Sequence, residues 1–446
     1  MVYVTSLSRW LRWCSQTNRW LWCDLGEEVE ATKQAVLELY RLACLRAAEK
    51  PESGQRLVAE IAALQREPRI RAVLTLAKSE AGMSIRPEAL DGHPTMLGVN
   101  NGLVDLRTGS LKPNDPSLYI TKYVNIDFVP DAVCPAFVAF LFEVMNEDVQ
   151  TIAAVQRLAG LTLTGIPDEE IIVFCVGTGA NGKSIFSNIL YGIFGPYAKT
   201  APSTLLSARR ADDHGARSDL AMLAGTRLVS INELPGGMIL DETVAKQLAG
   251  REPIAARFLH KEFFTFQPCF TPWVRTNHRP IIKGTDNGIW RRLVIIPFRR
   301  TFSPEEQDLK LEAKLRRESQ GILAWMVAGA VSYLGNGIQL SPAMKAELSQ
   351  YRTDSDLLGE FLSEKTDADP AEEEKQAVLY FEYQRWCETD GLRATSKRVF
   401  SEQLSERGYG QRKSGPDRYY TGLKLGAGRT AGGECGQVGQ VRGLFA

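Results

Sequence analysis

The amino-acid sequence predicts an α/β protein with a phosphate-binding loop at its centre, and two observations support this. Residues 171–176 form a short apolar run rich in β-branched side chains, which indicates a buried strand. The next eight residues, 177–184, read GTGANGKS and complete the G-x-x-x-x-G-K-[ST] pattern. Apolar residues in 185–194 then recur at helical spacing, so strand, glycine loop and helix follow one another in the order that this motif requires.

The loop composition fits a site for the phosphates of a nucleotide. Glycines let backbone N–H groups turn toward phosphate oxygens, and the N-terminus of the following helix adds partial positive charge. We expect Lys183 to reach the β- and γ-phosphates of ATP and Ser184 to hold Mg²⁺. The alternative, a chance glycine-rich turn, does not explain the flanking strand and helix. The predicted cofactor-binding residues are Gly177, Thr178, Gly179, Ala180, Asn181, Gly182, Lys183 and Ser184.

A second buried strand ends in an acid. Residues 226–233, TRLVSINE, place Glu233 50 residues after Lys183. After a phosphate loop, such an acid is expected to polarise the attacking water and to help position Mg²⁺. The alternative is a glutamate that ends a strand without a chemical role. We therefore expect Glu233 to be catalytic and, with Ser184, to contribute to the metal site.

Two further strands carry polar residues at their ends. The apolar run 270–274 leads into Asn277, whose amide could sense the γ-phosphate if its strand lies beside the phosphate loop; an ordinary turn asparagine is the alternative. Arg291 and Arg292 directly precede the apolar strand 293–296. Arginine at this position could cap a structural carboxylate. It could equally reach a neighbouring subunit's nucleotide, because its planar fork suits phosphate oxygens.

Composition argues against several classes of protein. No run of 18 apolar residues is present, so the sequence predicts no membrane span. The eight cysteines contain no C-x-x-C pair and indicate reduced thiols of a cytoplasmic protein. The formal net charge is zero, yet residues 253–300 hold nine Lys or Arg against two acids, and residues 393–424 hold eight against three. Any site for a polyanionic partner is therefore expected to be local.

The chain divides into seven expected segments. Four tryptophans in residues 1–25 suggest a hairpin; they could stack on bases, but packing in a core is the favoured interpretation. The acid-rich stretch 364–374 suggests a linker, and helix, helix and hairpin after it follow the order of a winged helix. The glycine-rich end is expected to be disordered. The segments are 1–85 (hairpin and helices), 86–165 (β-rich, then helical), 166–300 (core), 301–363 (helical part of the core), 364–375 (linker), 376–425 (winged-helix-like) and 426–446 (tail).

The winged-helix-like segment carries basic residues that could contact DNA phosphates. They are Lys397, Arg398, Arg412, Lys413 and Arg418.

Several ordered stretches resemble the superfamily 3 helicases, specifically the poxvirus-type primase-helicases of phages, satellites and plasmids. The resemblance covers about residues 90–425. It rests on NNGLVDLRTGSL, GTGANGKS, LVSINE, RTNHRP, GTDNGIWRRL, GILAWMVAGA and YFEYQRWCETDG. By this resemblance the core is an AAA+ domain that assembles into a homo-hexameric ring around single-stranded or forked DNA.

The resemblance also implies how the ring works. ATP would sit between subunits, with Lys183, Ser184, Glu233 and Asn277 on one side. Arg292 would be the finger from the next subunit, with Arg291 as the second choice. A basic hairpin in the central channel corresponds to Arg257, His260 and Lys261.

These residues predict an ATP- and Mg²⁺-dependent replicative DNA helicase of a phage, satellite or plasmid-like element, acting in the bacterial host cytoplasm. Relatives often carry an upstream primase domain, which this chain lacks, so we expect no primer synthesis and a separate primase partner. The alternative is an ATP-controlled DNA-binding initiator with little unwinding activity. A small-molecule kinase would leave the basic hairpin and the C-terminal segment unexplained.

Overall fold

The computed structural model describes residues 1–207, 218–259, 262–282, 287–389 and 394–426. The chain divides into two compact units, 1–282 with 288–348 and 283–287 with 349–446. The first unit contains the N-terminal elements and a central parallel sheet, and the second contains a small antiparallel sheet with its own helices.

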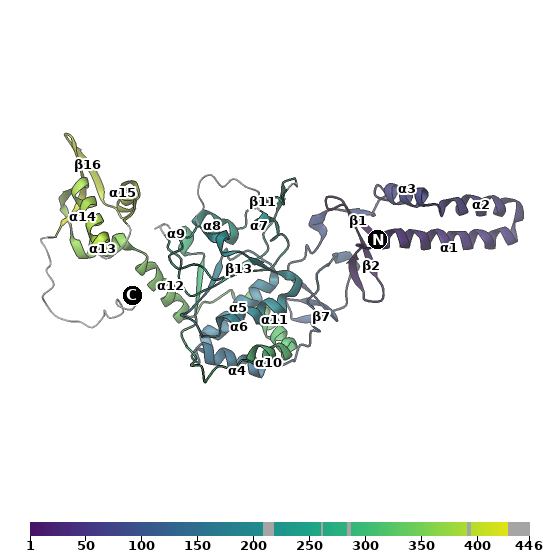
Figure 1. Ribbon diagram of the computed structural model, residues 1–446, viewed down its shortest axis with the longest axis horizontal. Coiled ribbons are helices and arrows are strands. Elements are labelled where there is room, and N and C mark those ends of the chain that lie inside the picture. Colours follow the sequence, from purple (N-terminus) through teal and green to yellow (C-terminus); the bar gives the residue numbers. More distant parts are fainter. Residues whose placement is uncertain (208–217, 260–261, 283–286, 390–393, 427–446) are drawn as a thin grey trace. The chain divides into compact units, whose positions relative to one another are not determined.

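The N-terminal segment combines a sheet with three helices. The strands β1 (Val2–Val4), β2 (Arg9–Cys14), β3 (Arg19–Trp22) and β4 (Ser84–Ile85) pair in the order β3-β2-β1-β4. The predicted hairpin is β2–β3, and Trp10 and Trp20 are buried, which confirms core packing for these two tryptophans. The helices are α1 (Glu27–Glu49), α2 (Pro51–Leu64) and α3 (Glu67–Ala77), and α1 and α2 lie side by side (Figure 1).

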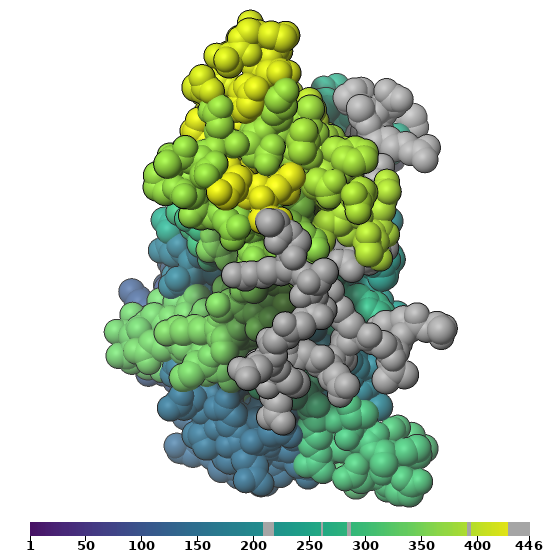
Figure 2. Space-filling view, turned by 90° about the vertical axis from the view of Figure 1, so that its left-hand side faces the viewer, coloured from purple at the N-terminus to yellow at the C-terminus, as the bar shows by residue number. Residues whose placement is uncertain are grey.

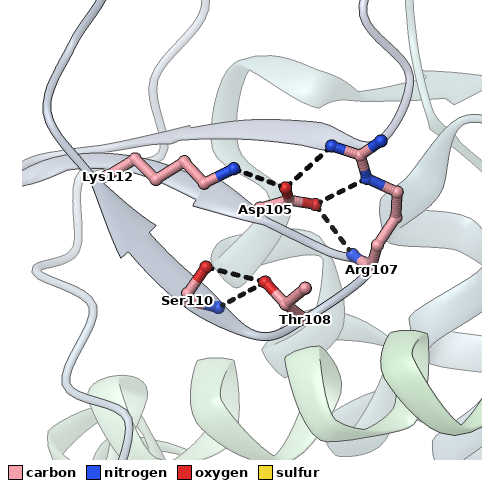
Figure 3. A network of polar contacts seen from close by, with 5 residues as sticks. All are labelled: Asp105, Arg107, Thr108, Ser110 and Lys112. Atoms are coloured by element: carbon pink, nitrogen blue, oxygen red, sulfur yellow. Dashed lines mark hydrogen bonds and ion pairs between the residues drawn. The ribbon is translucent and has the colours of Figure 1, made fainter.

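The next segment forms an antiparallel meander of β5 (Met96–Val99), β6 (Gly102–Asp105) and β7 (Ser110–Lys112). The Asp105 carboxylate is buried, and it accepts hydrogen bonds from Arg107 Nη2 at 2.8 Å and from Lys112 Nζ at 2.7 Å (Figure 3). The bonds from Arg107, followed by those from Lys112, hold the pKa of Asp105 well below its usual range. This charge cluster ties the two strands of the β6–β7 hairpin together.

A five-stranded parallel sheet forms the core, in the order β14-β8-β13-β10-β9. Its strands are β8 (Ile172–Val176), β9 (Ala198–Ala201), β10 (Leu228–Asn232), β13 (Thr271–Thr276) and β14 (Leu293–Pro297). Strands β8 and β14 are apolar on both faces because helices cover both faces, as is usual for a parallel sheet. The parallel core and its predicted strands are therefore confirmed.

The two sheet faces carry different helices. Val173, Cys175 and Trp273 belong to the hydrophobic core that includes α5 (Val149–Thr164), α6 (Lys183–Phe194) and α11 (Ser319–Asn336). Helix α8 (Glu242–Ala249) contacts β8 and β13 and lies on the other side of β13 (Figure 1). The remaining helices around the core are α4 (Pro135–Val144), α7 (Ser218–Ala221), α9 (Asn287–Trp290), α10 (Leu311–Arg317) and α12 (Pro342–Asp354).

A short antiparallel hairpin of β11 (Ile254–Ala256) and β12 (Phe264–Phe266) follows α8, as the sequence predicts. Its expected basic tip residues, His260 and Lys261, lie outside the described residues.

In chain order, the second unit consists of a helix, a strand, two helices and two further strands. Its three strands pair in the order β15-β17-β16 around a core that includes Phe361, Tyr383 and Phe400. The elements are α13 (Leu357–Lys365), β15 (Thr366–Lys375), α14 (Gln376–Thr389), α15 (Lys397–Glu406), β16 (Gly410–Ser414) and β17 (Asp417–Leu425). The β16–β17 hairpin, coloured yellow, projects from the green helices of this unit (Figures 1 and 2).

The predicted acidic linker at 364–375 is wrong. Thr366–Lys375 is the strand β15, which pairs with β17, and α13 before it packs in the same core. Two acids of β15 are paired across the sheet: Glu373 accepts from Arg412 Nε at 2.8 Å, and Glu372 accepts from Lys424 Nζ at 2.7 Å. An exposed edge strand tolerates such a run of acids, so its composition resembles that of a linker. Residues 427–446, predicted as a disordered tail, lie outside the described residues.

Candidate active site

The phosphate loop has a backbone that glycine makes possible. It leaves β8 at Gly177 and enters α6 at Lys183. Gly179, Ala180 and Gly182 have φ angles of 114°, 45° and 81°, in the left-handed region that favours glycine. A Cβ at position 182 would also lie 2.6 Å from Val144 Cγ1, so the loop packs too closely on α4 for any other residue there.

The loop is anchored to the chain that follows β14. Asn181 is 3% exposed, and its Nδ2 donates to the Phe298 carbonyl at 3.3 Å. The Phe302 amide donates to the Ala180 carbonyl at 2.8 Å. The sequence motif marks Asn181 only as a variable loop position and gives no signal for this anchoring role.

Lys183 is 4% exposed and is held by the loop itself. Its Nζ donates to the Gly177 carbonyl at 2.6 Å and to Asn181 Oδ1 at 2.8 Å, and neither acceptor is charged. Burial, together with the nearby Arg275 guanidinium, lowers the pKa of Lys183 to about 8. A buried ammonium that finds no carboxylate partner in the described part of the chain is well suited to bind a phosphate anion.

Glu233 is the first residue after β10, and its side chain is exposed. It has a φ of 52°, which is rare for glutamate, and its amide donates to the Arg275 carbonyl at 2.8 Å. Left-handed residues other than glycine cluster at functional sites. Asn277 follows β13 and is also exposed; the turn after it is shaped by Thr276 Oγ1, which accepts from the His278 amide at 3.1 Å.

The sheet order brings these residues to one edge. Strand β13 lies between β8 and β10, with Thr276 opposite Val176 and Arg275 opposite Asn232. The phosphate loop, Asn277 and Glu233 therefore follow the carboxyl ends of three adjacent strands. The Glu233 carboxylate and the exposed Ser184 hydroxyl supply oxygen donors, which Mg²⁺ prefers. The residues present thus fit the phosphates of a nucleotide and their metal ion.

Arg291 and Arg292 lie at the opposite edge, where Leu293 pairs with Ile172 at the start of β8. The Arg292 side chain is 14% exposed; its Nη2 donates to Glu170 Oε2 at 2.6 Å and its Nη1 to the Gly288 carbonyl at 2.7 Å. The Arg291 side chain is 67% exposed, and its Nη2 lies 3.5 Å from the same Glu170 oxygen. Within one chain Arg292 caps a carboxylate, while Arg291 remains accessible.

The hairpin candidates are only partly described. Arg257 lies over the Phe263 ring, with its Cζ 4.6 Å from the ring centroid. Phe258, Leu259 and Phe263 are exposed around the tip. This part of the hairpin therefore presents apolar side chains beside one cation.

The basic residues of the second unit fall into two groups. Arg398 pairs with Glu402 at 2.9 Å and Arg412 pairs with Glu373. Lys397, Lys413 and Arg418 are exposed, and the described residues offer no hydrogen bond or ion pair to their side chains. The second group is thus available to an external anion.

Sequence reasoning missed Arg275 and Glu170. Arg275 lies in the strand that leads to Asn277, two residues before it, and this signal was present in the sequence. Nothing in the sequence identifies Glu170 as the carboxylate that meets Arg291 and Arg292.

Among the described helices, none has the length and apolar character needed to cross a bilayer.

Comparison with known families gives two matches. The profile of the family described as "D5 N terminal like" matches residues 1–146, and that of a "Family of unknown function (DUF5906)" matches residues 175–292. The second match contains the phosphate loop, Glu233, Asn277 and both arginines.

Similar curated proteins come from large DNA viruses. "Putative helicase L207/L206" of Acanthamoeba polyphaga mimivirus is 27% identical over 297 residues, covering 62% of this chain and 31% of that protein. "Putative helicase 022R" of Frog virus 3 is 26% identical over 320 residues, covering 67% and 31%. "Putative primase C962R" of African swine fever virus is 25% identical over 212 residues, covering 46% and 22%. The chain thus spans about a third or less of the length of these relatives.

A solved structure titled "The apo structure of NrS-1 C terminal region (305-718)" matches with a TM-score of 0.44 at 11% identity, over 68% of this chain and 78% of that one. The N-terminal third of the chain thus matches the D5 N-terminal-like family, and the similar viral proteins carry the names helicase or primase.

Proposed function

We propose that this protein is an ATP- and Mg²⁺-dependent DNA helicase or translocase that acts in the replication of a phage, satellite or plasmid-like element. One observation carries the proposal: a single edge of one parallel sheet gathers the phosphate loop, Asn277 and the strained Glu233. The viral relatives named as helicases or primases support the same role.

Each residue at this edge has a defined task. Lys183 neutralises the β- and γ-phosphates, and the loop amides and the N-terminus of α6 bind their oxygens. Glu233 orients the attacking water and accepts its proton, while Asn277 donates its amide to the γ-phosphate. Mg²⁺, held through Ser184 and Glu233, would supply charge neutralisation for the phosphates when bound.

The position of the arginines supports a site shared between subunits. They precede β14 at the amino edge, and the five residues of β8 separate the two edges by about 16 Å, at about 3.3 Å per residue. A guanidinium at that edge cannot serve the phosphates bound in its own chain. In the proposed hexameric AAA+ ring, Arg292 or Arg291 would instead reach the nucleotide of the next subunit.

The proposed DNA contacts are the β11–β12 hairpin, including Lys261, and the second unit. The helix, strand, helix, helix, strand, strand order of that unit agrees with a winged helix, and its last helix, α15, begins at Lys397. Lys397, Lys413 and Arg418 would bind phosphates along the backbone, which requires no sequence preference.

The decisive experiment measures ATPase rate with and without single-stranded DNA, together with the mass of the protein in solution and strand displacement on a forked substrate. We expect DNA-stimulated hydrolysis and unwinding by a ring-sized species. ATP-dependent assembly on DNA without unwinding would favour the initiator function instead. Hydrolysis by a monomer that ignores DNA would contradict both.

Mixed subunits test the shared site. A Lys183→Ala subunit has a defective phosphate loop and intact arginines. An Arg292→Ala or Arg291→Ala subunit has an intact phosphate loop and lacks one arginine. Mixing the two inactive variants should restore part of the hydrolysis if the finger acts between subunits, because some interfaces then combine two intact halves. No recovery with either arginine variant would contradict a finger at this position.

We also propose that this polypeptide makes no primers by itself and works with a separate primase. Incubation with template and labelled nucleotides tests this: short labelled products that depend on this protein would contradict the proposal.

A further inference from the structure

Arg275 occupies a central position in the proposed site that the sequence motifs do not assign. It is the penultimate residue of β13, directly opposite Cys175 on the phosphate-loop strand and Asn232 on the strand that leads to Glu233. Its own carbonyl accepts the amide hydrogen bond of Glu233 at 2.8 Å. Arg275 therefore lies between the loop and the proposed catalytic acid.

The Arg275 side chain leaves the sheet on the face that carries the phosphate-loop helix. Alternate residues of a strand share a face, so Arg275 points to the same side as Trp273. The Trp273 indole donates to Thr162 Oγ1 of α5 at 2.9 Å, and its ring lies 6.0 Å from that of Phe186 in α6. Arg275 thus faces the helix whose first residue is Lys183.

Among the described residues, none provides a counter-ion for Arg275. Its side chain is half-buried, and among the described residues no oxygen accepts a hydrogen bond from its guanidinium. Burial lowers the pKa of Lys183 and the nearby Arg275 charge lowers it further, whereas at Cys175 burial raises the pKa of the thiol and the Arg275 charge opposes part of that rise. Two neighbouring cations without an acid between them repel each other, and an anion with several charges would relieve that repulsion.

We propose that Arg275 is a second phosphate-binding cation within the same chain and that it recognises the γ-phosphate. The inference rests on the proposed nucleotide site. The loop amides cover the inner phosphates, and Lys183 reaches the β- and γ-phosphates. Arg275 lies one strand further toward Glu233, which is the side where the terminal phosphate and the attacking water must meet. Its planar fork can hold two oxygens of that phosphate at once.

The test compares the affinities of a non-hydrolysable ATP analogue and of ADP for the full chain. Arg275→Ala should weaken the analogue by about ten- to 150-fold, the range for a lost charged hydrogen bond, and ADP by less than about threefold. Arg275→Lys should give an intermediate value, since it keeps the charge and loses the fork. Lys199→Ala removes an exposed cation from β9 of the same sheet and should leave both affinities unchanged.

Equal weakening of the analogue and of ADP, or no change in either, would overturn the assignment. If circular dichroism shows that Arg275→Ala is unfolded, the affinities of the ATP analogue and of ADP are compared in Arg275→Lys and Arg275→Gln instead. Failure of the proposed function gives a different result: the wild-type protein then binds neither nucleotide, and Lys183→Ala makes no difference.

Discussion

The polar residues at the two edges of the central sheet differ in the partners that they find within the chain. At the carboxyl edge, the side chains of Ser184, Glu233 and Asn277 are exposed and find no hydrogen-bond partner among the described residues. At the amino edge, Glu170 meets three arginines: Arg292 at 2.6 Å, Arg291 at 3.5 Å and Arg251 at 3.7 Å. The carboxyl edge is complete only with a ligand, whereas the arginines of the amino edge already share a carboxylate partner within the chain. Substitutions at the first edge should therefore act on function, whereas Arg292→Ala at the second edge should also lower stability.

The largest effect is expected from Lys183→Ala. Removing the buried ammonium takes away the main counter-charge of the transferred phosphate, so the hydrolysis rate should fall by about a thousandfold. Steady-state ATPase assays check this, with Lys199→Ala as the matched surface control. Wild-type turnover in Lys183→Ala would refute the assignment of the carboxyl edge as the active site.

At the amino edge, the two arginines should differ in their effect on folding. Arg292→Ala should lower the free energy of unfolding by about 1–2 kcal/mol, because it removes two hydrogen bonds from a largely buried guanidinium. Arg291→Ala should change it by less than about 0.5 kcal/mol, as expected for an exposed pair. Urea unfolding monitored by circular dichroism measures both values. Equal losses would show that Glu170 depends on both arginines alike.

The lowered pKa of Lys183 makes nucleotide binding dependent on pH. With a pKa of about 8, Lys183 in the nucleotide-free protein is mostly charged at pH 7 and mostly neutral at pH 9, so ATP affinity should fall by about tenfold between these pH values.

The free energy of unfolding should change in the other direction. Between about pH 8 and pH 10.5 the lysine is protonated in the unfolded chain but largely neutral in the folded one, so stability rises with pH in that window. Fluorescence titrations at both pH values test the first statement, and Lys183→Ala should abolish the dependence.

The smallest effect is expected in the second unit, where the same contrast between free and paired cations recurs. Lys413→Ala combined with Arg418→Ala should weaken DNA binding severalfold and reduce the slope of log affinity against log salt by about 1.5, close to one unit per lost phosphate contact. Arg412→Ala should do less, because Glu373 already engages that guanidinium. Anisotropy titrations of labelled DNA at several salt concentrations provide the comparison. An equal loss in Arg412→Ala would show that the pair opens on binding.

The sequence predicts the carboxyl edge well because a local pattern encodes it. Strand, glycine loop and helix are contiguous, and Glu233 and Asn277 each follow a recognisable apolar run. The adjacency of β13 to β8 was expected for Asn277, and the sheet order confirms it. That Asn181 anchors the loop could not be predicted, because its partner Phe298 lies 117 residues away.

The sequence was misleading where charge pairs form across strands. Residues 364–375 resemble a linker because the sequence does not show that Arg412 and Lys424 pair with Glu373 and Glu372 in the folded unit. Glu170 could not be identified for the same reason, since Arg292 follows it by 122 residues. Periodicity reports which face of an element is buried, but it does not report which charge lies opposite.

The strand β15 also determines where this protein can be divided for study. A fragment that begins at residue 376 would lose the strand that covers one side of β17 and would leave only the β16–β17 ribbon beside its helices. Open strand edges promote association between chains, and isolated two-stranded ribbons are only marginally stable. A C-terminal fragment that begins before α13, at about residue 350, keeps the sheet intact and is the better choice for separate expression.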